Sequence, residues 1–403
     1  MIEILISWSI ILITTMIELD KNIILLLIIG VIYYMLIKYT EWTLEYKILI
    51  IINIISIYTI ILSKDIISMY IGLEGYSYTI YYLIVKELTK ERKRVGLNYI
   101  IINSISSILI LYNLYIIIYE YNTITITLLS NLERINGIWF ILGILFKLGI
   151  YPFITIYYRI NKEISKGMIL YITSVSPIIN IYLLYKFNEI LNFPNYIIGG
   201  IGIITIILAN IKGLKETKIN EILIYSSIIT SSYIIISLGL YLNREIEFNR
   251  TYLLSITLYL LQVILIFSLI LLWNRRSNLL TFNINSFFPY LSLIIVILSY
   301  IGFPPLSGYY LKIYLVYPII VNNYDLSIKL VIMTGFFIGN LLSILLYFKW
   351  IIPSSTLTNT LYSISLITSK EERLIYWLII IYITTWLIII YPIILGMIYI
   401  WYC

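Results

Sequence analysis

Three ionisable side chains lie inside long apolar segments of the chain, where a charge is costly. Glu74 lies in IISMYIGLEGYSYTIYYLIV, Lys147 in GIWFILGILFKLGIYPF and Lys312 in GFPPLSGYYLKIYLV. A charge at the centre of a bilayer costs about 2.5–3.5 kcal/mol on insertion scales. Ionisable groups retained at that depth are typical of an ion or proton pathway. A static ion pair, or a polar tether between helices, is the structural alternative.

These side chains offer acid–base chemistry that needs no cofactor. At about 4 Å and an effective dielectric constant near 20, Glu74 and Lys147 on neighbouring helices would attract each other by roughly 4 kcal/mol. A rearrangement that makes and breaks this pair would load and unload a proton on the lysine. Lys312 would serve as a second proton station in the other half of the chain. We therefore expect these three residues to transfer protons.

The composition excludes most other kinds of site. Of the 403 residues, 61% are hydrophobic and 12% are charged, which is typical of a polytopic membrane protein. With no histidine and a single cysteine, Cys403, the sequence offers no ligand cluster for zinc, haem or iron–sulfur. It also contains no nucleotide-binding glycine pattern, phosphate loop or nucleophile elbow. We therefore expect no metal-binding, cofactor-binding or redox site on this chain.

Apolar runs of roughly spanning length alternate with short polar loops along the chain. A spanning helix needs about 17–25 residues, and most of the runs reach that length. The runs cover 2–18, 23–37, 46–62, 65–86, 98–119, 137–158, 167–186, 196–211, 221–241, 251–273, 287–320, 327–349 and 374–400. The sequence therefore predicts an all-α fold, a polytopic transmembrane bundle of about 13 helices.

The basic residues divide unequally between alternate loops. With the N-terminus assigned to side X, eighteen Lys and Arg residues fall on side X and seven on side Y. Under the positive-inside rule, side X is the cytoplasmic or matrix face, so the N-terminus lies inside and the C-terminus outside. The net charge of +7 thus reflects topology, and we expect no nucleic-acid partner.

One run, 287–320, is too long for a single straight crossing at about 1.5 Å per residue. It contains Gly302, Pro304, Pro305 and Gly308, and proline removes a backbone donor and clashes with the preceding helical turn. We expect the helix to break there, facing protein or a wet cavity. A simple kink is the alternative.

The run at 137–158 has a milder interruption, with Gly149 and Pro152 just after Lys147. The two interrupted helices, each with one buried lysine, lie about 165 positions apart. This pattern is typical of transporters built from two inverted repeats, each with a discontinuous helix at the working site.

Four stretches of the chain resemble the antiporter-like membrane-arm subunits of respiratory complex I, the proton-pumping NADH:ubiquinone oxidoreductase, and among them the mitochondrially encoded chain 2 type. They are IGLEGYSYTIYYL, LFKLGIYPF, INEILIYSSI and LSYIGFPPLSGYYLK, within about 65–345. The second and fourth stretches are the specific ones. The lack of histidine and the presence of Lys312 distinguish the chain from the subunit 4 and 5 relatives and from multisubunit sodium/proton antiporters.

The resemblance implies a proton-translocating subunit whose redox chemistry occurs elsewhere. NADH, FMN, iron–sulfur clusters and ubiquinone would be bound by partner subunits. The partners would be other membrane-arm subunits, including subunit 4-like and 4L-like neighbours, together with membrane lipids. The implied location is the mitochondrial inner membrane, with the N-terminus on the matrix side and the C-terminus on the intermembrane-space side. A stand-alone cation/proton antiporter and a non-catalytic membrane scaffold stay open as alternatives.

The resemblance also divides the chain into four parts. N-terminal transmembrane helices would occupy 1–64, a first antiporter-like half 65–190 and a second half 191–350, followed by a loop and a C-terminal transmembrane helix at 351–403. Glu74 falls on the fourth predicted helix, whereas the family carries this glutamate on its fifth. The chain is therefore expected to lack one N-terminal helix of the family's full form.

Two positions depart from the family pattern. A further lysine, usual in the helix after Lys147, is replaced at about Ile178 in SVSPIINIY. The basic pair usual before Leu-Leu-Ala-Tyr-Ser-Ser is Asn220 and Glu221 here. The missing lysine argues against a simple chain of three intramembrane bases.

Polar side chains could line a hydrated path between the lysines, because a hydroxyl group both donates and accepts hydrogen bonds. The candidates on the central helix are Tyr225, Ser226, Ser227, Thr230, Ser231 and Ser232. Those on the helix after Glu74 are Asn103, Ser104, Ser106 and Ser107. Ser174, Ser176 and Asn180 could hold water in place of the missing lysine. Alternatively, such residues are ordinary small packing residues of membrane helices.

Overall fold

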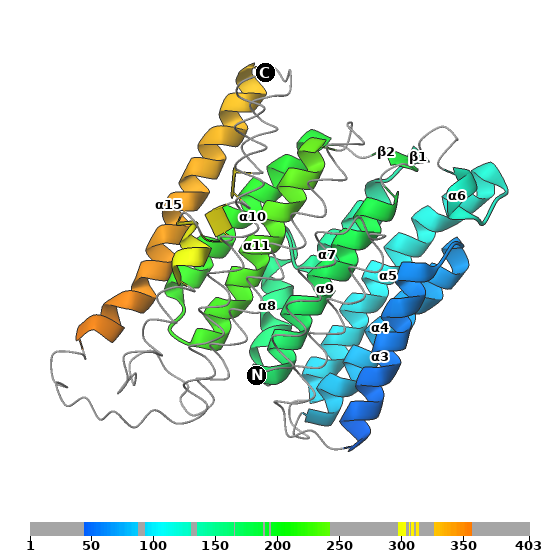
Figure 1. Cartoon of the computed structure of the whole chain (residues 1–403), viewed down its shortest axis with the longest axis horizontal. Helices are drawn as coiled ribbons and strands as arrows, with labels where there is room; N and C mark the ends of the chain where they lie inside the picture. Colours follow the sequence, from blue (N-terminus) through cyan, green and yellow to red (C-terminus); the bar gives the residue numbers. More distant parts are fainter. Residues whose placement is uncertain are drawn as a thin grey trace.

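The structure, a computed structural model, is mostly helical, and its long helices lie side by side (Figure 1). It describes residues 44–87, 93–129, 135–164, 166–187, 190–192, 195–241, 297–303, 306, 308, 309, 312, 313 and 326–356. The predicted runs at 2–18, 23–37, 251–273 and 374–400 lie outside the described residues.

The described apolar runs form helices, because a segment in hydrocarbon must satisfy its backbone groups internally. The long helices are α3 (Leu44–Leu62), α4 (Ile66–Glu87), α5 (Lys93–Tyr121), α9 (Lys166–Phe187), α10 (Asn195–Lys215), α11 (Ile219–Tyr241) and α15 (Leu326–Thr356). Between α5 and α9 lie the shorter α7 (Ile138–Leu148) and α8 (Ile154–Lys162). Figure 1 shows α3, α4 and α5 at one edge of the bundle, α7, α8 and α9 in the middle, and α10, α11 and α15 at the other edge.

Short elements join loops at one end of the bundle. A single helical turn, α6 (Ile126–Leu129), follows α5, and the two-residue strand β1 (Ile135–Asn136) follows α6. β1 pairs in parallel with β2 (Leu191–Asn192), which follows α9. The helical fold class is thus confirmed for the described bundle, with these two small strands as an addition that apolar periodicity does not reveal.

The predicted interruption in the run at 137–158 lies between α7 and α8. Gly149 adopts a left-handed conformation with φ 68°. Its N–H group donates to the carbonyl oxygens of Leu145 and Phe146, and the N–H of Ile150 donates to Leu145 at 3.0 Å. This is a Schellman motif, which ends a helix and needs glycine at the left-handed position.

The second interruption follows the helical residues 297–301, which are the described part of the helix before it. Gly302 is also left-handed, with φ 88°. Its N–H donates to the carbonyl oxygens of Leu298 at 3.0 Å and Ser299 at 3.2 Å, and the N–H of Phe303 donates to Leu298 at 3.0 Å. The two helices therefore end in the same way, bond for bond. Pro304 and Pro305 lie outside the described residues.

The spacing of the two breaks differs from the spacing of the two lysines. Gly149 and Gly302 are 153 positions apart, whereas Lys147 and Lys312 are 165 apart. Lys147 therefore precedes its break, and Lys312 follows its own. The two lysines therefore occupy different places relative to the interrupted helices.

Loops that the charge count assigned to side Y touch one another at one end of the bundle. Asp65, between α3 and α4, pairs with Thr125, after α5. The Lys186 ammonium, at the end of α9, donates to the Ser63 carbonyl oxygen at 2.6 Å. β1 and β2 join the loop after α5 to the loop after α9. These contacts agree with the alternation of the described helices.

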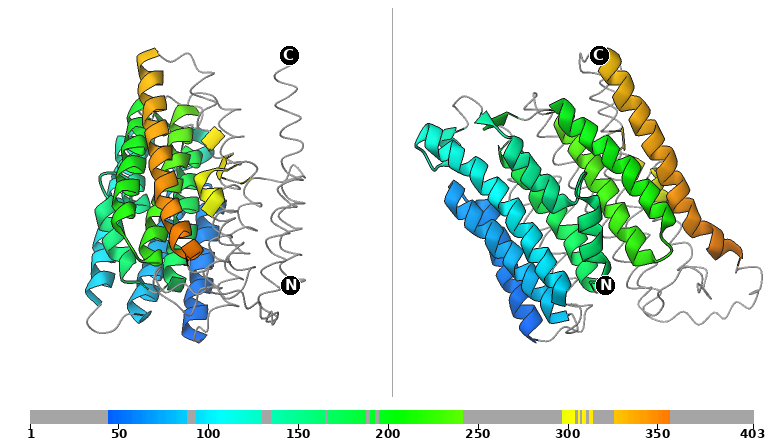
Figure 2. Two further views of the ribbon diagram at one scale, coloured as in Figure 1. Left: turned by 90° about the vertical axis from the view of Figure 1, so that its left-hand side faces the viewer. Right: turned by 180° about the vertical axis from the view of Figure 1, so that it is seen from behind.

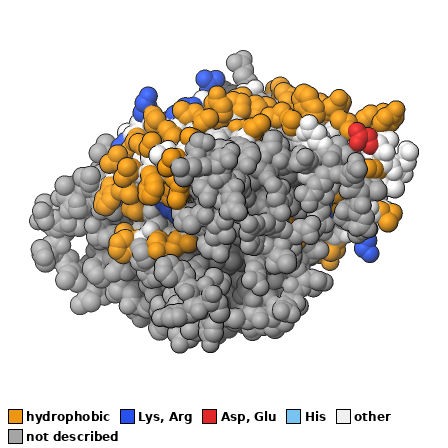
Figure 3. Space-filling model, turned by 90° about the horizontal axis from the view of Figure 1, so that it is seen from above, with side chains coloured by type: hydrophobic (Ala, Val, Ile, Leu, Met, Phe, Trp, Pro, Cys, Tyr) orange, Lys and Arg blue, Asp and Glu red, His pale blue; other side chains and the backbone are white. Residues whose placement is uncertain are grey.

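The described surface is largely apolar. Three described helical segments are long and apolar enough to cross a membrane, namely Val95–Tyr121, Ile197–Lys215 and Leu330–Lys349. Figure 3 shows hydrophobic side chains covering much of the described surface seen from above, with a few Lys and Arg among them. The two views in Figure 2 show the long helices running in similar directions through the bundle. This geometry suits a bundle in lipid.

Candidate functional site

Glu74 and Lys147 face the interior of the bundle from different helices, but they do not pair. Glu74 lies on α4 and Lys147 on the last turn of α7, and α5 packs against both helices. The Glu74 Oε1 and Lys147 Nζ atoms are buried and have no hydrogen-bond partner among the described residues. The Ser77 hydroxyl, one turn after Glu74, donates to the Glu74 backbone oxygen at 2.9 Å and lies 3.5 Å from Oε2. The structure therefore holds the predicted acid–base pair in its separated form.

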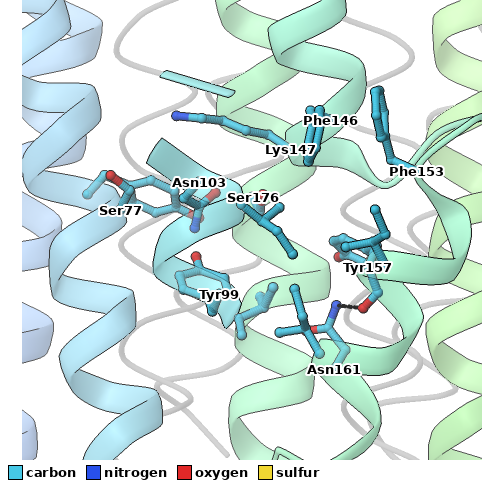
Figure 4. A pocket seen from close by; sticks show the side chains of 14 residues that line it. Ser77, Tyr99, Asn103, Phe146, Lys147, Phe153, Tyr157, Asn161 and Ser176 are labelled. Atoms are coloured by element: carbon cyan, nitrogen blue, oxygen red, sulfur yellow. Dashed lines mark hydrogen bonds between the residues drawn. The ribbon is translucent and has the colours of Figure 1, made fainter. Parts of the chain in front are cut away.

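A small cavity lies against the Lys147 side chain (Figure 4). Its polar lining consists of Tyr76, Ser77, Tyr99, Asn103, Lys147, Tyr157, Asn161 and Ser176. The volume within it that the centre of a water molecule can occupy is about 30 Å³. One water needs roughly 10–15 Å³ by this measure, so the cavity has room for about two.

The cavity contains polar atoms that lack protein partners. Besides Lys147 Nζ, the Asn103 Nδ2 and Asn161 Oδ1 atoms are buried without a hydrogen bond among the described residues. Asn161 uses its other amide atom, since Nδ2 donates to the Tyr157 carbonyl oxygen at 3.0 Å. Figure 4 shows Lys147 near one end of the cavity and Asn161 near the other. Unpartnered buried polar atoms beside a void of this size are the setting that buried water occupies.

The helix α9 supplies polar groups where the family's further lysine is missing. Ile178 is fully buried, and Ser176 lines the cavity. Asn180 Nδ2 donates to the Ser176 backbone oxygen at 2.8 Å and to its hydroxyl at 3.2 Å. The Ser174 side chain lies outside the described set. Ser176 is thus the residue of this predicted group that adjoins the Lys147 cavity.

The hydroxyl groups of α11 are directed to their own helix. Each of Ser226, Ser227, Thr230, Ser231 and Ser232 donates to the carbonyl oxygen three residues earlier, at 2.7 to 3.0 Å. Their hydrogen atoms are therefore engaged, and only their oxygen lone pairs are available to water. The Tyr225 ring stacks on that of Tyr158, with centroids 4.8 Å apart. This arrangement is typical of helix packing as well as of a polar path.

Lys312 has a different environment from Lys147. Its ammonium donates to the Ile301 carbonyl oxygen at 2.6 Å and lies 5.6 Å from the centroid of the Tyr233 ring. A Cβ added to Gly302 would lie 2.9 Å from the Lys312 side chain, so the glycine also makes room for it. Gly308 is in a helical conformation just before Lys312. The sequence pattern predicted the break and the lysine but not the part played by Tyr233.

A charged cluster that the sequence did not reveal joins α8 to the turn before α11. Lys162 forms an ion pair with the buried Glu221 carboxylate at 3.2 Å, and Lys218 lies 3.7 Å from the same carboxylate. The Tyr158 hydroxyl donates to Glu216 at 2.8 Å. The Glu216 carboxyl, in the turn between α10 and α11, is hydrogen-bonded to Glu221, and this bond and burial raise the pKa of the Glu216 carboxyl. The charge count assigned these loops to side X. The only sign of the cluster in the sequence was Glu221, which departs from the basic pair usual in the family.

Comparison with known proteins gives relatives named as subunits of NADH-quinone and NADH-ubiquinone oxidoreductases. The chain is 24% identical over 300 residues to the NADH-quinone oxidoreductase subunit N of Pelagibacter ubique, covering 67% of this chain and 61% of that protein. It is 26% identical over 312 residues to the NADH-ubiquinone oxidoreductase chain 2 of Dictyostelium discoideum, covering 70% and 63%. The chain thus spans less than two thirds of the length of these relatives.

Solved structures share the fold. The Mrp complex from Dietzia sp. DQ12-45-1b contains a similar chain, with a TM-score of 0.68 at 15% identity, covering 82% of this chain and 66% of that one. The archaeal membrane-bound sulfane sulfur reductase contains another, with a TM-score of 0.67 at 14% identity, covering 82% and 57%. The model of the NADH:quinone oxidoreductase/Mrp antiporter transmembrane family matches residues 63–341, about two thirds of the sequence, and the chain therefore belongs to this family.

Proposed function

We propose that this chain is a proton-translocating membrane-arm subunit of the respiratory NADH:ubiquinone oxidoreductase. Protons would move through Glu74, Lys147 and Lys312 and through water, driven by redox chemistry on other subunits. The observation that carries the proposal is the Lys147 amine, buried beside a polar cavity with no hydrogen-bond partner among the described residues. An unpaired amine in such a place is costly as structure alone, and it is suited to exchange a proton with water.

The separated state of Glu74 and Lys147 supports a cycle of pairing and release. When the two groups approach each other, the carboxylate would stabilise the protonated lysine. In the separated state of this structure, Glu74 acts on the lysine only at a distance, so that stabilisation is weaker, and cavity water would accept the proton. Asn103 and Asn161 would orient this water, since both have an unpartnered buried atom at the cavity. Ser176 and the α11 hydroxyls would extend the polar path towards Lys312.

The finer architecture belongs to the same proposal. We infer about thirteen transmembrane helices and two inverted repeats, approximately 65–190 and 191–350, and the matching breaks at Gly149 and Gly302 support the repeat. The N-terminal segment 1–64 and the C-terminal segment 351–403 would flank them. The relatives named chain 2 support a place in the mitochondrial inner membrane, with the N-terminus on the matrix side.

The partners follow from the names of the relatives. Membrane-arm neighbours of the subunit 4-like and 4L-like types would adjoin this chain, and lipids would cover the rest of its surface. NADH, FMN, iron–sulfur clusters and ubiquinone would be bound by other subunits. A stand-alone cation/proton antiporter is the second candidate, favoured by the fold shared with a chain of the Mrp complex.

The decisive experiment replaces the lysines in the assembled complex. In sealed inner-membrane vesicles, Lys147→Met and Lys312→Met are expected to lower the number of protons pumped per NADH oxidised, because each removes a proton-carrying group. Lys47→Met, at an exposed position near the start of α3, is the matched control and is expected to pump normally. Unchanged pumping in both Met variants would favour a scaffold. Native-gel migration near 47.4 kDa, rather than in a large assembly, would favour the stand-alone antiporter.

A further inference from the structure

We infer that Tyr233 is a positioning residue for Lys312, and that its ring and the Ile301 carbonyl oxygen together hold the Lys312 ammonium. This inference rests on the proposed role of Lys312 in proton transfer. It adds a residue from α11, outside the broken helix, to the working site of the second half.

The break itself creates the first part of this binding place. In the Schellman motif at Gly302, the two backbone N–H donors are used by Leu298 and Ser299. The Ile301 carbonyl oxygen, at the end of the same helical segment, receives the Lys312 ammonium at 2.6 Å. A helix C-terminus carries partial negative charge, which favours a cation there. The lysine is thus held by a backbone oxygen that the interrupted helix leaves available.

The Tyr233 ring supplies the second part. The Lys312 Nζ atom lies 5.6 Å from the ring centroid, within the range of about 6 Å at which an aromatic face attracts a cation. Tyr233 itself is 3% exposed, so the interaction takes place away from bulk water. Desolvation strengthens a cation–π interaction compared with an exposed site.

Contacts from α15 fix the orientation of the ring. The Tyr233 hydroxyl donates to the Asn340 side-chain oxygen at 2.7 Å. The Phe336 ring packs edge-on against Tyr233, with centroids 6.1 Å apart and an interplanar angle of 72°. The Ser343 hydroxyl donates to the Asn340 backbone oxygen at 2.8 Å. Because the hydroxyl is occupied by Asn340, the ring face is left for the cation, and α15 fixes its position.

No carboxylate assists this lysine within the part of the chain that the structure describes. The titratable side chains described near the break are tyrosines: Tyr233 on α11, Tyr300 and Tyr309 on the broken helix, and Tyr347 on α15. The rings of Tyr300 and Tyr347 lie 5.3 Å apart, beside the same helix end. Tyrosines are neutral near pH 7. The ammonium form of Lys312 therefore depends on a ring and a carbonyl dipole, whereas Lys147 has an acid, Glu74, as its candidate partner.

The test uses the assembled complex in sealed vesicles and measures protons pumped per NADH oxidised from about pH 6 to pH 9. In Tyr233→Leu, we expect the alkaline decline of this ratio to move to lower pH by about one unit, because the ammonium loses the ring. Tyr233→Phe retains the ring and is expected to follow the wild-type profile. Phe187→Leu removes a fully buried ring of α9 that packs on Phe140 and takes no part in holding Tyr233 or Lys312, and it is the matched control for packing.

The possible outcomes distinguish a failure of the role inferred for Tyr233 from a failure of the proposed function. Should Tyr233→Leu fail to assemble, Tyr233→Met fills the space with a flexible side chain and carries the same expectation. A wild-type profile in the Leu or Met variant, with pumping lost in Lys312→Met, would refute the role of Tyr233 and leave the function intact. An equal shift in Tyr233→Phe or in Phe187→Leu would also refute it. Normal pumping in Lys312→Met would instead refute the proposed function.

Discussion

At the scale of single residues, the sequence identified the ionisable groups but not their surroundings. Glu74, Lys147 and Lys312 are visible in the sequence because a charge in an apolar run is rare whatever the fold. Asn161 and Tyr233 are ordinary in sequence, since their importance comes from what the other helices place beside them. Contacts between distant segments leave no mark in local composition, so these residues could not be predicted.

The carboxyl pair at the α10–α11 turn gives a prediction about pH. The bond to Glu221, together with burial, raises the pKa of the Glu216 carboxyl above its ordinary value. The folded state then binds this proton more tightly than the unfolded chain. The Glu216 carboxyl therefore costs no stability at a pH below its ordinary pKa. It destabilises the fold as the pH rises from that ordinary pKa through the raised pKa of the folded state.

Glu216→Gln is expected to remove that dependence. The amide can still accept from the Tyr158 hydroxyl, and it donates to Glu221 without a titrating proton. Thermal inactivation of the detergent-solubilised complex should therefore vary less with pH in Glu216→Gln than in the wild type. Glu216→Ala, which offers no acceptor to Tyr158, should be less stable at every pH. Equal pH slopes in the wild type and Glu216→Gln would contradict this prediction.

At the scale of elements, the sequence predicted both helix interruptions, and their construction emerged only in the structure. Glycine and proline mark a break because they limit the backbone locally, and local rules can be read from sequence. The matching hydrogen bonds at Gly149 and Gly302 could not be predicted, because they depend on the residue at which each helix ends. The length of α15, which continues to Thr356, was also underestimated.

Close packing of α7 on α5 gives a prediction for a glycine. A Cβ at Gly143 would lie 2.6 Å from the Ile110 side chain and 2.7 Å from the Ser106 backbone oxygen. Gly143→Ala should force the two helices apart and destabilise the subunit by about 1–3 kcal/mol. Lys147 lies one turn later on the same face of α7, so the pumping ratio should fall as well.

Another helical glycine provides the control. A Cβ at Gly199 of α10 meets nothing within 4 Å, and alanine is the better helix former, so Gly199→Ala should be neutral or slightly stabilising. Complex abundance on native gels and the pumping ratio in vesicles measure both variants. A Gly143→Ala complex as abundant and active as wild type would show that α5 and α7 are not tightly packed at this point.

At the scale of the whole molecule, contacts at the side X end join helices that lie far apart in the sequence. Lys162 of α8 pairs with Glu221 of α11. Lys349 of α15 donates to the carbonyl oxygens of Leu214 and Glu216, at the end of α10, at 2.7 and 2.9 Å. The charge count predicted that these loops share a side, because topology depends on composition. It could not show which residues meet, since that depends on how the helices pack.

Lys349 tests whether this end serves assembly or proton transfer. Its ammonium caps carbonyl groups at the negative end of α10, and hydrogen bonds to a charged group contribute about 1.5–3 kcal/mol. Lys349→Met should therefore lower the thermal inactivation temperature of the solubilised complex, while Lys349→Arg, which retains donors and charge, should retain most of the stability. Because Lys349 lies away from the Lys147 cavity lining, the complex that does assemble should pump the normal number of protons per NADH. Normal assembly with reduced pumping would instead place Lys349, and with it the side X cluster, on the proton path.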